Sequence, residues 1–205
     1  MEEKLLKTQS PYLTSDYLQA LYGDLQMPKN KIAGLVKKGD LIPVRRGLYL
    51  HGKNYERLYS KVVLSGMIYG PSAISFEYAL SHYGLIPERV EVITCLCFKR
   101  DKKFETPVGN FHYKYISKDL YPEGLEFFQT ELGNYFMASA EKALCDMAYF
   151  QTITSVKSAE VYLFESMRVD RDEIKKLSLE KLLLLERCYQ RKSVGLVVDA
   201  LRGEM

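Results

Sequence analysis

The stretch PKNKIAGLVKKGDLIPVRRGLYL, residues 28–50, decides how the N-terminal part of this chain folds. Pro28 suits the first position of a helix, and Gly39 with Asp40 suits its end, so the pattern predicts a helix over about residues 28–38. At 100° per residue, one stripe of this helix is apolar and consists of Ile32, Leu35 and Val36. We therefore expect one face of the helix to pack and the other to meet solvent or a partner.

The residues on either side extend this pattern. Residues 41–44 and 48–50 predict two short strands joined across Arg45, Arg46 and Gly47. Upstream, Thr14 or Ser15 can cap a short helix through Tyr22, with Tyr17, Leu18 and Leu21 on its packing face. Helix, turn, helix and basic hairpin in this order predict a winged helix-turn-helix.

The outward face of the second helix has the residue types that read DNA. A helix fits the major groove of B-DNA, where Asn30 and Lys31 near its N-terminal end would reach base edges. Lys37 and Lys38 would meet phosphates, and Gly34 would let the backbone approach the duplex closely. At the hairpin tip, we expect Arg45 and Arg46 to contact phosphate or to enter the adjacent minor groove.

The distribution of charge agrees with a polyanionic partner. Residues 27–57 hold eight Lys and Arg against two acidic residues, a net charge of +6. The whole chain has a net charge of +3, so the remaining residues together carry −3. A basic stretch within a slightly acidic protein is typical of nucleic-acid binding. The alternative is a winged helix that only docks onto protein, in which the same lysines serve solubility.

Residues 58–205 have the pattern of a separate, larger domain. We expect two helical segments over about 55–85, broken at Gly70-Pro71, with Ser72 and Ala73 on an apolar helix face. We expect a strand over 90–98, a hairpin over 104–116 and one or two further strands over 127–137. Helices are expected over about 139–150, 156–168, 170–176 and 178–202, the last of them either continuous or broken near 193–195. The fold class is α+β: a winged helix-turn-helix (1–57), then a mixed α/β domain (58–205) with a β-sheet and C-terminal helices.

Four stretches of the sequence resemble the AbiEi family of bacterial antitoxin-type transcriptional regulators. They are GDLIPVRRGLYL (39–50), GPSAISFEYALSHYGLIPERVEVIT (70–94), FHYKYI (111–116) and MASAEKALCDMAYF (137–150). The resemblance covers about residues 10–150, and it differs at Ala140, where the family usually has proline. It implies an N-terminal winged helix and a larger antitoxin domain. It further implies a repressor of its own operon that counteracts a nucleotidyltransferase-like toxin in abortive phage infection.

Catalytic motifs are absent from the sequence, and we expect no enzyme activity, no cofactor and no metal. Asp170 and Asp172 form a D-x-D, but Asp170 with Glu173 also forms a D-x-x-E, which is typical of a helix cap. His51, His82 and His112 lack the spacing of metal ligands or triads, and no phosphate-cradling glycine loop is present. An enzymatic or protein-binding α/β domain that uses its winged helix for docking remains the alternative.

The cysteines and the apolar runs indicate the compartment. Cys95, Cys97, Cys145 and Cys188 have no disulfide-framework spacing, and we expect reduced, mostly buried thiols. No apolar run approaches the roughly 18 residues that cross a bilayer, and the N-terminus lacks the apolar stretch of a secretory signal. We therefore expect a cytoplasmic protein that binds double-stranded DNA at its own promoter, with two copies associating on the DNA because one winged helix buries limited surface.

Overall fold

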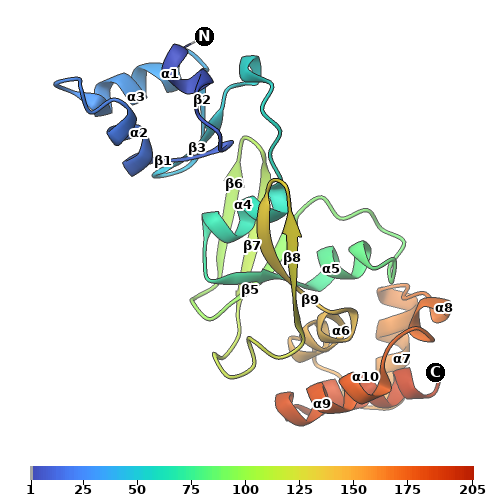
Figure 1. The fold of residues 1–205 in the computed structure, drawn as a ribbon. Helices are drawn as coiled ribbons and strands as arrows, with labels where there is room; N and C mark the ends of the chain where they lie inside the picture. Colours follow the sequence, from blue (N-terminus) through green and yellow to red (C-terminus); the bar gives the residue numbers. More distant parts are fainter. Residues whose placement is uncertain (1) are drawn as a thin grey trace.

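The computed structural model describes residues 2–205, and its N-terminal part is a small unit of helices around a three-stranded sheet (Figure 1). The sheet order is β1-β3-β2, and both pairs are antiparallel. The elements are α1 (Glu3–Leu6), β1 (Tyr12–Thr14), α2 (Ser15–Leu21), α3 (Pro28–Lys37), β2 (Leu41–Arg45) and β3 (Leu48–His51). The two helices and the hairpin predicted for this segment are confirmed, whereas α1 and β1 lie outside the prediction.

Local signals explain where these helices begin and end. The Thr14 side chain accepts a hydrogen bond from the Tyr17 amide at 3.2 Å and so caps α2. Pro28 occupies the first turn of α3. Gly39 ends that helix at a φ of +77°, and the Asp40 amide donates to the Leu35 carbonyl at 2.9 Å.

A small apolar core holds the N-terminal unit together. Its buried members come from both helices, the strands and the segment after β3: Leu5, Leu13, Leu18, Tyr22, Ile32, Leu35, Leu41 and Tyr55. Ile32 and Leu35 are buried and Val36 packs beside them, so the predicted apolar stripe of α3 is confirmed. Tyr17, predicted on the packing face of α2, is 46% exposed, although it lies only about 40° around the helix from Leu21, which packs against the core.

The larger unit is built on a six-stranded mixed sheet in the order β6-β7-β5-β4-β9-β8. The β5–β7 and β4–β9 pairs are parallel, and the other pairs are antiparallel. The strands are β4 (Ser72–Ile74), β5 (Ile93–Cys97), β6 (Lys102–Thr106), β7 (Gly109–Tyr115), β8 (Leu125–Thr130) and β9 (Gly133–Ala138). The protein is therefore of the mixed α+β class. The hairpin predicted over 104–116 is confirmed, and the strands expected over 127–137 are β8 and β9, which pair as a second hairpin.

Helices precede, interrupt and follow this sheet. They are η1 (Lys53–Tyr55), α4 (Lys61–Ile68), α5 (Phe76–His82), α6 (Ala140–Tyr149), α7 (Val156–Glu160), the π-helix η2 (Val161–Ser166), α8 (Arg171–Ile174), α9 (Leu179–Tyr189) and α10 (Lys192–Arg202). Helices α6 to α10 gather at the C-terminal end of the molecule (Figure 1). The predicted C-terminal helical region is confirmed.

The sheet corrects the expectation for Ser72 and Ala73. Both lie in strand β4, which pairs with β5 and β9, and not on a helix. Ala73 and Ile74 are almost fully buried, because a short strand in the middle of a sheet has packing on both faces. An apolar run of this length suits either a buried strand or a buried helix, so periodicity alone chose wrongly.

Two element ends also differ from the sequence predictions. Strand β5 begins at Ile93, not at residue 90, because residues 90–92 have no ladder partner in the sheet. The predicted helix over 178–202 is two helices, and the break lies at Gln190 and Arg191 rather than near 193–195. Gln190 adopts the left-handed conformation at φ +48°, which ends α9, and Ser193 lies inside α10.

Helix α6 carries a buried charged network that joins the sheet to the C-terminal helices. The Lys142 ammonium lies 3.4 Å from the Asp146 carboxylate, and neither side chain is exposed to solvent. Lys142 also donates to the Tyr189 hydroxyl at 2.8 Å, Tyr189 donates to Asp146, and the Ser75 hydroxyl donates to Asp146 at 2.5 Å. Burial raises the pKa of Asp146, and the Lys142 charge opposes that rise. The Lys142–Asp146 pair, at positions i and i+4 of α6, is thus part of the core.

Contacts connect the N-terminal unit to the larger one. The Tyr12 hydroxyl accepts a hydrogen bond from the Ser60 amide at 2.9 Å, and the Arg45 guanidinium donates to the Met67 carbonyl at 3.1 Å. Leu48 and Leu50 of β3 belong to the apolar cluster that forms the core of the larger unit. The hairpin β2–β3 therefore contacts α4.

Candidate nucleic-acid interface

The outward face of α3 is open. Asn30, Lys37 and Lys38 are exposed, and Gly34 faces space in which an added Cβ would meet no atom within 4 Å. Within residues 2–205, Lys37 and Lys38 form no ion pair with an acidic side chain. Four of the five predicted residues of this helix therefore share one accessible surface with uncompensated positive charge.

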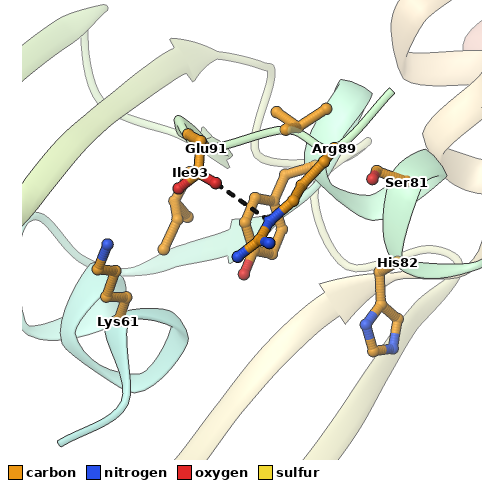
Figure 2. Close-up of a pocket in the computed structure, with 8 residues that line it drawn as sticks. Lys61, Ser81, His82, Arg89, Glu91 and Ile93 are labelled. Atoms are coloured by element: carbon orange, nitrogen blue, oxygen red, sulfur yellow. Dashed lines mark ion pairs between the residues drawn. The ribbon is translucent and has the colours of Figure 1, made fainter. Parts of the chain in front are cut away.

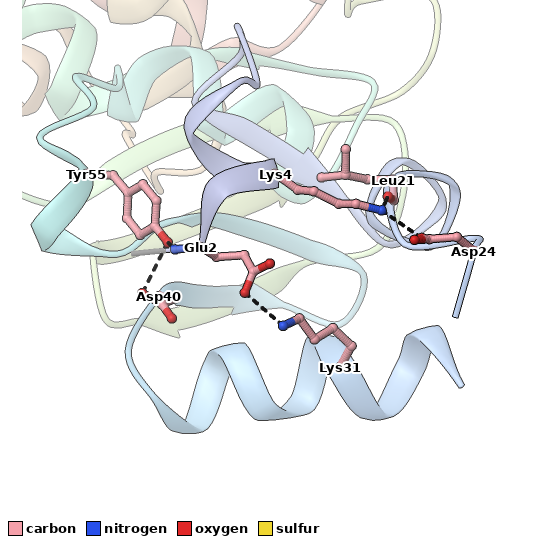
Figure 3. Close-up of polar contacts among 7 residues, drawn as sticks. All are labelled: Glu2, Lys4, Leu21, Asp24, Lys31, Asp40 and Tyr55. Carbon is pink, nitrogen blue, oxygen red and sulfur yellow. Dashed lines mark hydrogen bonds and ion pairs between the residues drawn. The ribbon is translucent and has the colours of Figure 1, made fainter. Parts of the chain in front are cut away.

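Lys31, the fifth predicted residue, points elsewhere. Its ammonium lies 2.8 Å from a carboxylate oxygen of Glu2 (Figure 3). It also lies 5.7 Å from the centre of the Tyr22 ring. The side chain is only 33% exposed. Lys31 thus bridges α3 to the N-terminal segment, and base reading by this residue requires that it leave Glu2.

The same N-terminal segment is fixed by further polar contacts, as Figure 3 shows. Lys4 lies 2.7 Å from Asp24 and donates to the Leu21 carbonyl at 3.0 Å. Tyr55 donates to Asp40 at 3.2 Å and accepts from the Glu2 amide at 2.7 Å. Helix α1 is thereby attached to both α2 and the end of α3.

The hairpin presents one free and one engaged arginine. Gly47 completes the turn at a φ of +82°, and both Arg45 and Arg46 are exposed. Arg46 has no acidic partner within the described chain, whereas Arg45 donates to the Met67 carbonyl as well as to the Arg46 carbonyl at 3.3 Å. Arg46 is consequently the more available of the two for a phosphate.

The structure adds a second cationic surface, which the sequence prediction missed. We call it the basic–aromatic patch; it consists of Lys99, Arg100, Lys102, Tyr69 and Phe104. The ammonium groups of Lys99 and Lys102 lie 5.5 and 5.7 Å from the centre of the Tyr69 ring, and Tyr69 donates to the Arg100 carbonyl at 3.3 Å. Cations held over ring faces are partly ordered while their charge stays exposed.

This patch adjoins the hairpin. Residues of β2 approach β6, and the carbonyls of Met67 and Gly70 at the end of α4 accept hydrogen bonds from Arg45 and Lys99, respectively. The run KRDKK, residues 99–103, carries four cations in five residues and is the signal that would have found it. The cationic surface therefore continues from the hairpin onto the larger unit.

A polar hollow of about 310 Å³ lies beside the end of α5 (Figure 2). Lys61, His82 and Arg89 contribute cationic or titratable groups to it, and Tyr78 and Ser81 contribute hydroxyls. Arg89 is 91% exposed and is paired with Glu91 at 3.1 Å, so its charge is already compensated. The Ser81 hydroxyl in this hollow donates to the Glu88 carbonyl at 2.7 Å.

The carboxylates and thiols have structural environments. Asp170 accepts hydrogen bonds from the Asp172 and Glu173 amides at 2.7 and 3.3 Å, which confirms the helix-cap interpretation of the D-x-D. Asp172 instead pairs with Lys175 at 2.8 Å. Burial raises the pKa of Cys95 to about 12, as expected for an inert thiol. Within residues 2–205, no cluster of three His, Cys, Asp or Glu side chains could hold a metal ion.

No known protein-family model matches the chain, and neither does any curated protein. Among the helices of the described residues, none combines the length and the apolar character needed to cross a bilayer.

Proposed function

We propose that the protein is a DNA-binding transcriptional repressor whose N-terminal unit is a winged helix-turn-helix. The observation that carries this proposal is the open face of α3 beside the hairpin, which together present Lys37, Lys38 and Arg46 without acidic partners. The helix would enter the major groove with Asn30 at the bases, and Arg46 would meet the adjacent backbone or minor groove. The target is double-stranded DNA at the promoter of its own gene.

The basic–aromatic patch supports the same partner. Its cations adjoin the hairpin, so a duplex seated on α3 would pass beside them. Contacts of this kind position the protein along the phosphate backbone and carry no sequence information. Two copies would bind inverted or direct half-sites spaced by about one helical turn, 34–36 Å, or a multiple of it.

Salt-dependent binding tests this function. Full-length protein is titrated into a duplex from the region upstream of its gene and into a scrambled duplex of equal length, across a range of salt concentrations. If about five phosphates are neutralised, the logarithm of the affinity falls against the logarithm of salt with a slope near −4.5. A slope near zero, or equal affinity for an acidic polypeptide, would favour a winged helix that only docks onto protein.

A separate experiment tests whether Asn30 recognises DNA bases. Asn30→Ala should alter the ranking of duplexes that differ at single base pairs, because an amide side chain discriminates bases by about 1–3 kcal/mol. Lys37→Ala is the matched control on the same face, and it should weaken all duplexes alike. An unchanged ranking for Asn30→Ala would place base reading on another residue.

We further propose that the larger unit supplies antitoxin activity against a nucleotidyltransferase-like toxin and performs no chemistry itself. The resemblance to the AbiEi family supports this role. The motif MASAEKALCDMAYF contributes Lys142 and Asp146 to the core, so direct contact with a toxin would use other, exposed residues. Co-expression with the product of the neighbouring gene tests it: Lys37→Glu with Arg46→Glu should lose repression and keep growth rescue.

A further inference from the structure

A cavity of about 520 Å³ lies between the sheet of the larger unit and its helices. Helix α5, strands β5 and β7, helix α6 and the π-helix η2 each contribute to its wall. The side chains used in this argument are Glu77, Glu88, His112, Met147 and Tyr162. This cavity is separate from the cationic surfaces of α3 and the hairpin, none of whose residues line it.

The wall is mostly apolar. Ile86, Val90, Val92, Met147 and Met167 provide branched and thioether side chains. Cavities of 300–1,000 Å³ with such walls and a few placed polar groups are typical of small-molecule sites. The apolar part of a ligand would therefore be a ring system or a branched chain.

Two polar atoms in this wall lack partners. The Tyr162 hydroxyl and one carboxylate oxygen of Glu88 are buried and have no hydrogen-bond partner within the described chain. The other oxygen of Glu88 is engaged by Arg168. A buried polar atom without a partner is unfavourable unless a ligand or water satisfies it, and here two such atoms line one cavity.

The π-helix places one of these atoms at the wall. The Met167 amide donates to the Tyr162 carbonyl at 2.9 Å, five residues back, so the turn is wider than an α-helical turn. Tyr162 and Ser166, within this turn, both line the cavity. Turns of this kind occur mostly as local insertions in α-helices and are frequent at functional sites.

The charged groups of the wall are acidic: Glu77 and Glu88 line it, and no Lys or Arg of residues 2–205 does. Glu77 has no ion pair among residues 2–205, so its carboxylate charge is uncompensated at the cavity. Burial and the nearby Lys103 hold the pKa of His112 below its ordinary value, which keeps the imidazole neutral. Burial raises the pKa of Tyr162 to about 12, so its hydroxyl remains protonated.

We propose that this cavity binds a small primary amine with an apolar body, its ammonium group held by Glu77, the free oxygen of Glu88 and the Tyr162 hydroxyl. An ammonium group has three donors and no acceptor, which matches this set of oxygens. The carboxylate of Glu77 supplies the compensating charge, because Arg168 already neutralises Glu88. The apolar body lies against Met147 and Val92.

The test uses three probes of the same shape and different charge: tryptamine, its alcohol analogue tryptophol, and indole-3-acetate. Each is titrated into full-length protein by calorimetry. Tryptamine should bind at least about tenfold more tightly than tryptophol, since a hydrogen bond to a charged group is stronger than a neutral one, and indole-3-acetate should bind most weakly. Equal affinity for all three would overturn the proposal, as would no binding by any of them.

Variants distinguish the proposed ammonium site from general apolar binding. Glu77→Gln should lower the affinity for tryptamine by about tenfold and leave the affinity for tryptophol unchanged. Glu180→Gln is the matched control, because Glu180 occupies the first turn of α9 as Glu77 occupies that of α5, but lies outside the cavity. If Glu77→Gln binds tryptamine as the parent does, the ammonium is not held by this carboxylate and the proposal fails.

Discussion

Helices α3 and α6 have equal length and opposite uses for lysine. Lys37 and Lys38 of α3 are exposed and uncompensated, whereas Lys142 of α6 is fully buried and contacts Asp146, Tyr189 and the Leu120 carbonyl. A buried charge must be paired, so α6 is committed to the fold. Lys37 and Lys38, unlike Lys31 of the same helical region, have no acidic partner among residues 2–205 and remain available to a polyanion. The accessible charge, rather than the number of charged residues, separates a binding helix from a core helix.

The largest expected effect is on the buried helix. Asp146→Ala leaves the Lys142 ammonium buried without its counter-ion, and the free energy of unfolding should fall by about 3–5 kcal/mol. Chemical denaturation at neutral pH measures it. Asp199→Ala, which removes a half-exposed partner 4.0 Å from Arg202, should leave stability nearly unchanged.

A double variant tests whether the lower stability of Asp146→Ala comes from the unpaired charge of Lys142. Lys142→Met combined with Asp146→Leu removes both charges and should recover part of the lost stability, because well-packed apolar residues can replace a buried pair. Equal stability of Asp146→Ala and Asp199→Ala would mean that the buried pair of α6 contributes no more to stability than a half-exposed pair does.

The next effect is on the open helix. Lys37→Ala with Arg46→Ala should make the salt-dependence slope of DNA binding shallower by about 2, roughly one unit per lost phosphate contact, without lowering stability. Fluorescence anisotropy with a labelled duplex measures the slope. Lys157→Ala removes an exposed cation from α7 and should leave it unchanged. If the double variant and Lys157→Ala change the slope equally, α3 and the hairpin do not form the DNA interface.

The basic–aromatic patch should give a smaller effect of the same kind. Lys102→Ala should reduce the slope by about 1 and weaken every duplex alike, because its charge would meet backbone and not bases. The comparison is made on a long duplex and on one that covers only the half-site. If Lys102→Ala weakens binding to the long and the short duplex equally, the patch contacts DNA only within the half-site.

The smallest effect concerns the N-terminal segment. Glu2→Gln releases Lys31 from its ion pair and should raise DNA affinity by no more than about fivefold, since partly exposed pairs contribute about 0–1 kcal/mol. Glu3→Gln is the control, because Glu3 pairs with Lys7 at 2.7 Å and not with α3. A gain in both variants would indicate a general effect of net charge.

Local signals made the N-terminal unit predictable. Pro28, Gly39 and Gly47 act through their own backbone conformations, so the ends of α3 and the turn of the hairpin followed from neighbouring residues. Strand β4 did not follow, because only the partners β5 and β9, up to about sixty residues away in the chain, make Ser72 part of a sheet.

The candidate site shows the same division. Asn30, Gly34, Lys37 and Lys38 were placed correctly on one face because helical periodicity decides this. The contact of Lys31 with Glu2 spans 29 positions and has no local signature. The i, i+4 spacing of Lys142 and Asp146 suits a pair on a helix, but their burial depends on Ser75 and Tyr189, which come from distant segments.

The C-terminal end of α4 joins the two cationic surfaces through one short piece of backbone. Its carbonyls at Met67 and Gly70 receive Arg45 from the hairpin and Lys99 from the basic–aromatic patch. A Cβ at Gly70 would come within 2.7 Å of the Gly66 carbonyl oxygen, so this backbone has little room to change. A substitution that shifts this backbone would therefore displace Arg45 of the hairpin and Lys99 of the patch together, so the spacing between the two surfaces is set by a single turn of chain.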